Sequence, residues 1–307
     1  MDIFFKSPVD IEIRLEGEDA RTHVDVPAPD YGKSVPLYAD GESVKGTVIV
    51  RPRDGKRFEH LGVKVQLIGT IEYKNEALAS AIKTSGSNTG DTGASDDFLS
   101  MAQELAAPAE LKHPETFEFE FKNVEKQYES YNGVNVQLRY YVRVLVLRRS
   151  SNVIRERNIW VYSYKMPPDS INSIKMDVGI EDCLHIEFEY SKSRYHLKDV
   201  IVGRIYFLLV RLKIKHMELS IIRRESVGAP PNQINESETL VRFEIMDGAP
   251  VKGETIPIRL FLGGFDLTPT YRDVNKKFST RTFLSLVLID EDMRRYFKQS
   301  EIILYRQ

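Results

Sequence analysis

Two stretches of the sequence repeat one pattern: "LYADGESVKGTVIV" at Leu37–Val50 and "YHLKDVIVGRIYF" at Tyr195–Phe207. Aligning Gly46 with Gly203 gives a constant offset of 157 residues (203 minus 46). The aligned pairs then include Tyr38 with Tyr195, Val44 with Ile201, Val48 with Ile205 and Val50 with Phe207. Both stretches are rich in β-branched and aromatic residues, as strands are, and a glycine inside a strand permits a bulge or a close backbone approach. We expect each stretch to be the strand that opens one of two similar modules.

Two further repeats follow in the same order in both halves of the chain. "ETFEFEF" at 115–121 resembles "ETIPIRL" at 254–260, and "VQLRYYVRVLV" at 136–146 resembles "FSTRTFLSLVL" at 278–288. These segments alternate between apolar and polar residues, as half-buried antiparallel strands do. Any two strands look alike, but three pairs in one order favour a duplicated β-sandwich. The sequence therefore predicts an all-β protein with two antiparallel β-sandwich domains.

The domain boundary is expected near "VYSYKMPPDSINSIKMDVGIED", because Pro167-Pro168 blocks regular ladder pairing. We place the N-terminal domain at 1–165 and the C-terminal domain at 166–307, with a linker at about 164–173. Domains joined by a short linker move relative to each other unless their interface is large.

One region of the first domain departs from the strand pattern. Residues 77–95 contain "TSGSNTGDTGAS", which has no packing side chains and is expected to be a flexible insertion. The next segment places Phe98, Met101 and Leu105 at helical spacing, and Pro108 follows. This spacing predicts one short helix over 96–106, packed on a sheet.

Composition bounds the function. The chain has 307 residues with 43 Lys and Arg against 45 Asp and Glu, so its net charge of −2 indicates no general attraction to nucleic acid. The single cysteine excludes an internal disulfide framework and favours a reducing cytosolic setting. No apolar run approaches the roughly 18 residues of a membrane span, and the first residues lack the apolar block of a secretory signal.

Signals for catalysis are weak. Cys183 and His185 would share a face of a strand, but the surrounding alternation favours a packed cysteine over a nucleophile. The six histidines show no zinc spacing, and "GSNTGDTG" lacks the context of a phosphate loop, so no metal or cofactor is expected. Carboxylates such as Glu118 and Glu120 alternate with core phenylalanines and indicate a solvated face. We expect no enzyme; a carbohydrate-active sandwich is the least favoured alternative.

One segment is unusual, "FEIMDGAPVKGETIPIRLFL" at 243–262. Ile245 and Met246 stand directly before the turn residues Asp247 and Gly248. An apolar pair at this place either closes the end of the sandwich or lies exposed at the tip, where it marks a protein interface. Residue pattern alone leaves both interpretations open.

Several segments together resemble a known family, the arrestin-like small subunit of retromer, vacuolar protein sorting-associated protein twenty-six. The residues that carry the resemblance are "SIKMDVGIEDCLHIEFEYSKSRYHLKDVIVGRIYFLLVRLKI", "FEIMDGAPVKGETIPIRLFL", "RDVNKKFSTRTFLSLVLIDEDMRRYFKQSEIILYR" and "VEKQYESYNGVNVQLRYYVRV". The resemblance covers nearly the whole chain and is strongest from Ser173 to Arg306. It implies two arrestin-like β-sandwiches and a non-enzymatic adaptor of the retromer coat, which resides in the cytoplasm and peripherally on the cytosolic face of endosomes.

The resemblance also implies partners. The C-terminal domain is expected to bind the large α-solenoid retromer subunit through the loop that matches Ile245, Met246, Asp247 and Gly248, and through it the metallophosphoesterase-like third subunit. A groove between the domains is expected to capture sorting signals in the cytosolic tails of transmembrane cargo, together with a sorting nexin. The matching groove positions are Val178, Gly179, Ile180 and Phe297. The expected outcome is retrieval of cargo from endosomes to the Golgi or the plasma membrane, with an indirect association with the endosomal membrane.

Two further predictions accompany this resemblance. Arrestin-like folds tend to bury charged residues between their domains, and Arg139 and Arg281 are candidates by pattern for such a polar core; plain charges at strand edges are the alternative. The alternative function is a stand-alone arrestin-type trafficking regulator that binds receptor tails. Such regulators often carry P-P-x-Y motifs, but Pro167-Pro168 and Pro230-Pro231 are not followed by that pattern.

Overall fold

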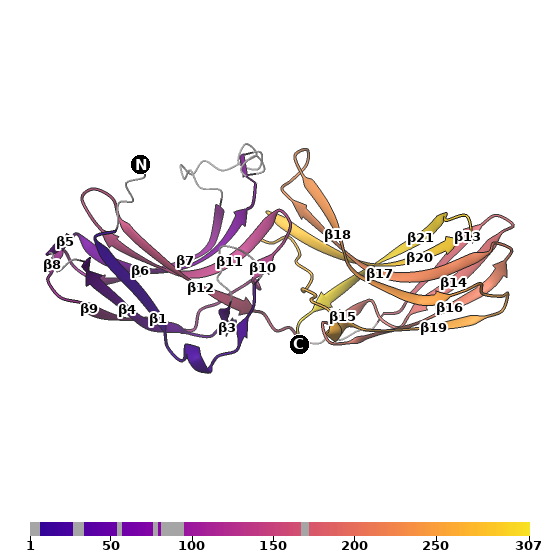
Figure 1. Cartoon of the computed structure of the whole chain (residues 1–307), viewed down its shortest axis with the longest axis horizontal. Helices are drawn as coiled ribbons and strands as arrows, with labels where there is room; N and C mark the ends of the chain where they lie inside the picture. The colour runs from indigo at the N-terminus through magenta and orange to yellow at the C-terminus, as the bar shows by residue number, and fades with distance from the viewer. Residues whose placement is uncertain (1–6, 27–33, 54–56, 76–78, 81–94, 167–171) are drawn as a thin grey trace. The chain divides into compact units, whose positions relative to one another are not determined.

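Strands make up nearly all of the regular secondary structure in the computed structural model (Figure 1), which describes residues 7–26, 34–53, 57–75, 79–80, 95–166 and 172–307. The prediction of an all-β fold is confirmed. Contacts divide the chain into two compact units, Met1–Ser163 and Tyr164–Gln307. The expected linker and the polar insertion at 77–95 fall largely outside the described residues.

The first unit packs a three-stranded sheet, in the order β1-β4-β9, against a larger sheet in the order β2-β3-β12-β11-β6-β7 (Figure 1). Strand β10 adds to β11, and β5 pairs with β8. The elements are β1 (Val9–Leu15), η1 (Glu18–Ala20), β2 (His23–Val24), β3 (Val35–Ala39), β4 (Val44–Pro52), β5 (Phe58–His60), β6 (Gly62–Tyr73), β7 (Ser95–Ala106), β8 (Ala109–Leu111), β9 (Glu115–Phe121), β10 (Tyr131–Asn132), β11 (Val136–Leu147) and β12 (Val153–Tyr162).

The second unit packs a four-stranded sheet, β13-β14-β16-β19, against a five-stranded sheet, β15-β21-β20-β17-β18 (Figure 1). Apolar residues from both sheets form one buried cluster between them. The elements are β13 (Ile174–Ile180), β14 (Leu184–Tyr190), β15 (Arg194–His196), β16 (Val200–Val210), β17 (Ile214–Val227), β18 (Ile234–Asp247), β19 (Thr255–Phe261), η3 (Leu262–Gly264), β20 (Phe278–Asp290) and β21 (Arg295–Tyr305).

The two units repeat one topology. The order β3-β12-β11-β6-β7 of the first unit corresponds strand by strand to β15-β21-β20-β17-β18 of the second, and β1-β4-β9 corresponds to β14-β16-β19. In the first unit β3 pairs with β12 in parallel, and in the second unit β15 pairs with β21 in parallel. The other neighbouring strands in these two orders pair antiparallel. The segments paired in the sequence, 115–121 with 254–260 and 136–146 with 278–288, occupy corresponding strands, β9 with β19 and β11 with β20.

The repeated stretches do not open each sandwich as single strands. Each one spans two strands and a tight turn, so that the chain crosses from the large sheet (β3 or β15) to the small sheet (β4 or β16). Tyr38 and Tyr195 are buried at corresponding places before the turn. Gly46 lies against the carbonyl oxygen of Arg14, and Gly203 against that of Glu189, so a Cβ atom at either glycine would overlap the neighbouring strand. The expected close backbone approach is therefore present in both units.

The short helix predicted over 96–106 is wrong, because this segment is strand β7 at the edge of the large sheet. Strand β7 pairs with β6 along its length, but two register shifts leave Phe98 and Leu105 as extra residues. Each bulge breaks the alternation, so the apolar residues recur every three or four positions and imitate a helical stripe. The Phe98 ring lies over Gly69, with its centroid 5.4 Å from that of Tyr140.

One buried charge organises the crossing in the first unit. The side chain of Lys126 is inaccessible to solvent, and its ammonium group donates to the carbonyl oxygens of Ala39 (3.1 Å), Glu42 (2.5 Å) and Val124 (3.2 Å). These bonds tie the β3–β4 turn to the segment after β9. Burial lowers the pKa of Lys126 to about 8, although nearby Glu42 and Asp40 oppose the shift.

We expect Gly203→Ala to lower the free energy of unfolding by about 1–3 kcal/mol, the usual cost of overpacking. The added methyl group would overlap the Glu189 carbonyl oxygen and lie 3.1 Å from Cδ1 of Tyr190. Gly179→Ala is the matched control in β13, because the nearest atom to its Cβ would be 4.0 Å away. Urea unfolding followed by circular dichroism measures both variants. Equal stability of the two would show that the close approach is not a constraint.

Lys126 predicts a pH dependence of stability. Above pH 8 the folded protein releases the Lys126 proton, whereas the unfolded chain holds it to its ordinary pKa of about 10.5. The unfolded state then binds more protons, so stability rises with pH in this window. The unfolding free energy of the wild type should increase relative to that of Lys126→Met by on the order of 1–2 kcal/mol between pH 7.5 and 9.5. Urea titrations at both pH values, with exposed Lys122→Met as the control, measure the difference, and a constant difference would contradict it.

Candidate partner-binding surface

The apolar pair of the unusual segment lies at the end of β18. In the pairing of β17 with β18, Met217 lies opposite Met246, but the next residue, Glu218, lies opposite Glu244. Ile245 is therefore the extra residue of a β-bulge. Because the bulge breaks the alternation of the strand, both Ile245 and Met246 contact the buried cluster of the second unit. Both remain partly exposed. The structure therefore combines the two interpretations of the sequence: the pair closes the end of the sandwich and still faces solvent.

The turn after β18 is held at both ends. Gly248 has φ = 111°, a conformation that favours glycine, and its N–H donates to the carbonyl oxygen of Lys215 at 2.8 Å. Gly253, with φ = 87°, donates to the carbonyl oxygen of Phe207 at 2.7 Å. Between these anchors the Val251 side chain is 65% exposed. The anchored backbone presents this apolar side chain in a defined position.

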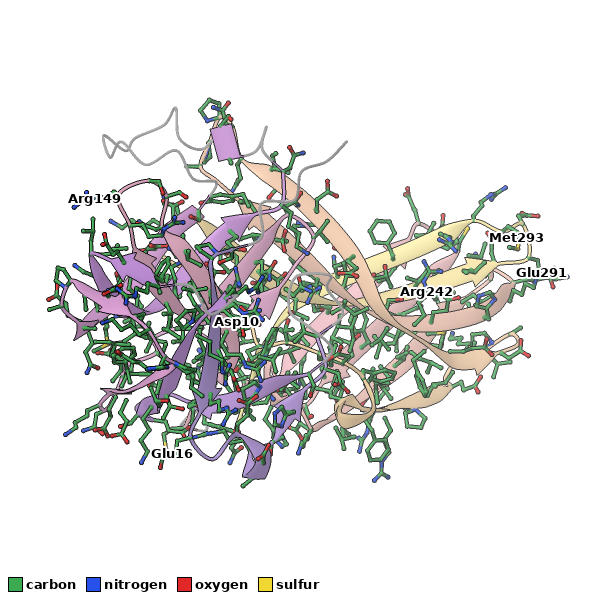
Figure 2. The ribbon with its side chains drawn as sticks, turned by 60° about the vertical axis from the view of Figure 1, so that its left-hand side comes forward. Asp10, Glu16, Arg149, Arg242, Glu291 and Met293 are labelled. Carbon is green, nitrogen blue, oxygen red and sulfur yellow. The ribbon has the colours of Figure 1, made fainter. Side chains whose placement is uncertain are left out.

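A second turn lies beside the first. The N–H of Glu291 donates to the carbonyl oxygen of Lys213, and Met293, 62% exposed and with φ = 63°, accepts a bond from Lys215 at 3.8 Å. Figure 2 shows Glu291 and Met293 together at the tip of this unit. We call the combined region the turn surface. It comprises Ile245, Met246, Asp247, Gly248, Val251 and Met293.

The chemistry of the turn surface suits protein binding. Its apolar side chains are bordered by charged groups, including Asp247 and the ion pair between Lys213 and Glu291 (3.6 Å). An apolar centre with a polar rim is the usual anatomy of a protein interface. Nowhere in the described ranges do three His, Cys, Asp or Glu side chains gather in a way that could hold a metal ion.

The predicted groove residues do not form one surface. Val178 and Ile180 pack against the buried cluster from β13, and Gly179 lies between them. Phe297 is 63% exposed and lies opposite Val287, on the outer face of the five-stranded sheet. Strands β13 and β21 approach each other where the Ser300 hydroxyl contacts the Met176 sulfur, but Phe297 points away from the core that Val178 and Ile180 face.

The two arginines proposed as a polar core take their partners within their own units. In the first unit, Arg139 is bound by Glu72 (3.1 Å), Glu156 (2.9 Å) and Asn158 (2.7 Å), and its side chain is 14% exposed. Its guanidinium lies 4.4 Å from the centre of the Tyr141 ring. Arg143 shares Glu156, so two arginines and two glutamates form a neutral network on the sheet.

Arg281 occupies the corresponding position in the second unit and is far more accessible. Its guanidinium binds both oxygens of Glu301, at 3.0 and 2.5 Å. The hydrogen bond from Arg281 holds the pKa of the Glu301 carboxyl below its ordinary value. This pair is a surface ion pair, whereas Arg139 anchors a half-buried network.

Sequence reasoning misplaced one residue and missed two others. Cys183 lies half-buried in the turn between β13 and β14, not packed within a strand, because its N–H closes that turn on the Ile180 carbonyl. Val251 and Met293 were not expected to contribute to the turn surface. The sequence could have indicated Val251, because it follows Pro250 within the unusual segment. It gave no indication of Met293, which lies over 40 residues later in the chain.

Two β-sandwich units of one repeated topology place the chain in the arrestin-like class of all-β proteins. The family description "Vacuolar protein sorting-associated protein 26" matches residues 5–293. The chain belongs to this family, which consists of trafficking subunits rather than enzymes and acts in vacuolar and endosomal protein sorting of the retromer type. None of the helices in the described part of the chain has the length and apolar character to cross a membrane.

Relatives from distant eukaryotes support this membership. Vacuolar protein sorting-associated protein 26 of Schizosaccharomyces pombe is 55% identical over 308 residues, covering 100% of this chain and 98% of the relative. The Dictyostelium discoideum protein of the same name is 51% identical, covering 99% of this chain and 83% of the relative. Vacuolar protein sorting-associated protein 26B of Homo sapiens is 50% identical, with 99% and 86% covered.

The contrast between the corresponding arginines predicts unequal effects on stability. We expect Arg139→Ala to lower the free energy of unfolding by about 3 kcal/mol, because two half-buried glutamates lose their shared cation. Arg281→Ala, the matched control, should change it by less than about 1 kcal/mol, as usual for exposed ion pairs. Urea unfolding combined with hydrogen exchange in each unit measures both effects. Equal losses would contradict the difference in environment.

Proposed function

We propose that this chain is a non-enzymatic adaptor subunit of the retromer coat and that its turn surface binds the large α-solenoid subunit. The observation that carries the proposal is the bulge in β18, which displays Ile245 and Met246 side by side at the end of the second unit. The family membership supports an assembly with other subunits. Through the large subunit, this adaptor is connected to the metallophosphoesterase-like third subunit.

The physical basis of this binding is burial of side chains that are already positioned. Ile245 and Met246 are held from behind by the core cluster, so little conformational freedom is lost when a partner covers them. Val251 and Met293 add exposed apolar area in the two turns that Lys215 contacts. Apolar anchors of this kind, surrounded by charged residues, carry most of the free energy of association at protein interfaces.

The adaptor also helps a sorting nexin to capture sorting signals in the cytosolic tails of transmembrane cargo, and the cargo then returns from endosomes to the Golgi or the plasma membrane. Strand β13 supports this part of the proposal, because it is the last strand of its sheet and carries Val178, Gly179 and Ile180. An extended peptide can add to such an edge. The protein then lies peripherally on the cytosolic face of endosomes, attached through its partners.

The decisive variant is Ile245→Asp with Met246→Asn. It places a charge and an amide in the centre of the apolar surface, so we expect co-purification of the large subunit to be lost and its affinity to fall by at least about 100-fold. The matched control is Val202→Asn with Leu208→Asp, which changes two exposed apolar residues of β16 on the other sheet.

The fold is checked by circular dichroism and gel filtration, because Ile245 and Met246 also touch the core. Asp247→Arg provides a second test at an exposed side chain of the same surface and should also weaken the complex. If folded variants bind the large subunit as the wild type does, the turn surface is not the binding site. Binding of receptor tails by a chain that never co-purifies with retromer would favour a stand-alone arrestin-type regulator.

A further inference from the structure

The outer face of the five-stranded sheet in the second unit carries an unusual pair of like charges. Strand alternation puts Arg281 and Phe283 of β20 on the face opposite the buried core. The register places Arg224 of β17 directly opposite Arg281. Side chains opposed in this way stand about 5 Å apart at their Cβ atoms, and like charges in such positions are destabilising.

An aromatic ring supports this arginine pair. The guanidinium carbons of Arg224 and Arg281 lie 5.0 and 5.1 Å from the centre of the Phe283 ring, which is only 8% exposed. Cations over aromatic faces are attracted to the ring, which partly offsets the repulsion between them. The ring therefore holds both guanidinium groups side by side at the surface.

The positive charge is incompletely neutralised. Glu301 binds Arg281 through both oxygens, whereas Arg224 has Ser237 as its hydrogen-bond partner, at 3.4 Å. Arg242, labelled in Figure 2, is exposed on the same face of β18, and the described part of the chain offers it no ion pair. Glu218 and Glu244 lie opposite each other on this face beyond Arg242, and Asp247 lies opposite His216 farther along β18.

On the corresponding face of the first unit, the arginines are neutralised by neighbouring carboxylates. There Arg139 and Arg143 flank Tyr141, the counterpart of Phe283, at 4.4 and 5.1 Å. Glu72 and Glu156 neutralise both arginines within the sheet. Arg139 and Arg281 are corresponding residues, whereas Arg143 and Arg224 lie on strands that do not correspond. The arginines of the first unit are neutralised within the sheet, whereas those of the second unit leave cations available to an external anion.

The backbone beside these arginines is also available. Strand β18 is the last strand in the order of its sheet, and residues 234–239 are all exposed. Ser237 is the residue of β18 that lies between Arg224 and the free edge. Because serine is small, a side chain on an added strand can reach over it to the Arg224 guanidinium.

We propose that an extended acidic segment of a partner protein adds to the free edge of β18 and places carboxylates on Arg224 and Arg242. Edge addition supplies main-chain hydrogen bonds, and alternate side chains supply specificity. The face of β18 toward the core carries Glu236 and Glu238, so the intervening residues of the segment should not be acidic. The segment therefore alternates acidic and neutral residues.

The test uses the full-length protein and fluorescent eight-residue peptides that alternate glutamate or lysine with threonine. Fluorescence anisotropy should show saturable binding of the glutamate peptide that weakens as salt is added, and little binding of the lysine peptide. Arg224→Glu with Arg242→Glu should weaken binding at least about 10-fold, as expected for loss of a charged contact. Arg259→Glu is the matched control, because Arg259 is an exposed strand arginine over Phe261 (5.4 Å) on the other sheet.

A second arm separates edge addition from simple attraction of charges. The glutamate peptide with alternate amides N-methylated keeps its charge but cannot pair with a strand edge, so its binding should be lost. Failure of the glutamate peptide to bind, indifference to the charge reversal, or tolerance of methylation each overturns the proposal. The proposal is also overturned if the Arg224→Glu, Arg242→Glu variant loses binding to phosphatidylserine vesicles but still binds the peptide. The Ile245→Asp, Met246→Asn variant should bind the peptide normally, which keeps this site distinct from the turn surface.

Discussion

Both units depend on one constraint, the close approach of two backbones at Gly46 and at Gly203. At these points the strand that follows the sheet-to-sheet crossing packs against its neighbour with no room for a Cβ atom. The crossing itself carries a buried tyrosine in each unit, Tyr38 or Tyr195. The geometry of the crossing sets the position of the small sheet over the large one, and the apolar faces of both sheets then close on a common core.

The two units share this constraint and differ in how they secure the crossing and neutralise charge. The first unit holds its crossing with the buried ammonium group of Lys126, which needs three carbonyl acceptors because a buried charge is unfavourable without partners. It also neutralises its arginines inside a half-buried network. The second unit leaves Arg224 and Arg242 without carboxylate partners among its described residues, and displays its apolar turn surface. Both units share one scaffold, and they differ in surface chemistry.

β-Bulges determine where the side chains of Phe98 in β7 and Ile245 in β18 lie. In β7 they bring Phe98 over Gly69 and produce the spacing that imitates a helix. In β18 a bulge places Ile245 next to Met246 on one face, where strict alternation would have separated them. A bulge is determined by the register between strands that are far apart in the chain, so neighbouring residues in the sequence do not reveal it.

The sequence by itself determined the all-β class and the correspondence of β9 with β19 and of β11 with β20, and it predicted the segment around Ile245 as a partner-binding site. These features depend on local alternation and on repeats, which are readable along the chain. Only the tertiary structure decided that residues 95–106 form an edge strand, that Phe297 points away from Val178 and Ile180, and that Met293 lies near the turn after β18. Local pattern could not settle these points, because pairing across a sheet satisfies backbone groups and selects faces through partners that are distant in sequence.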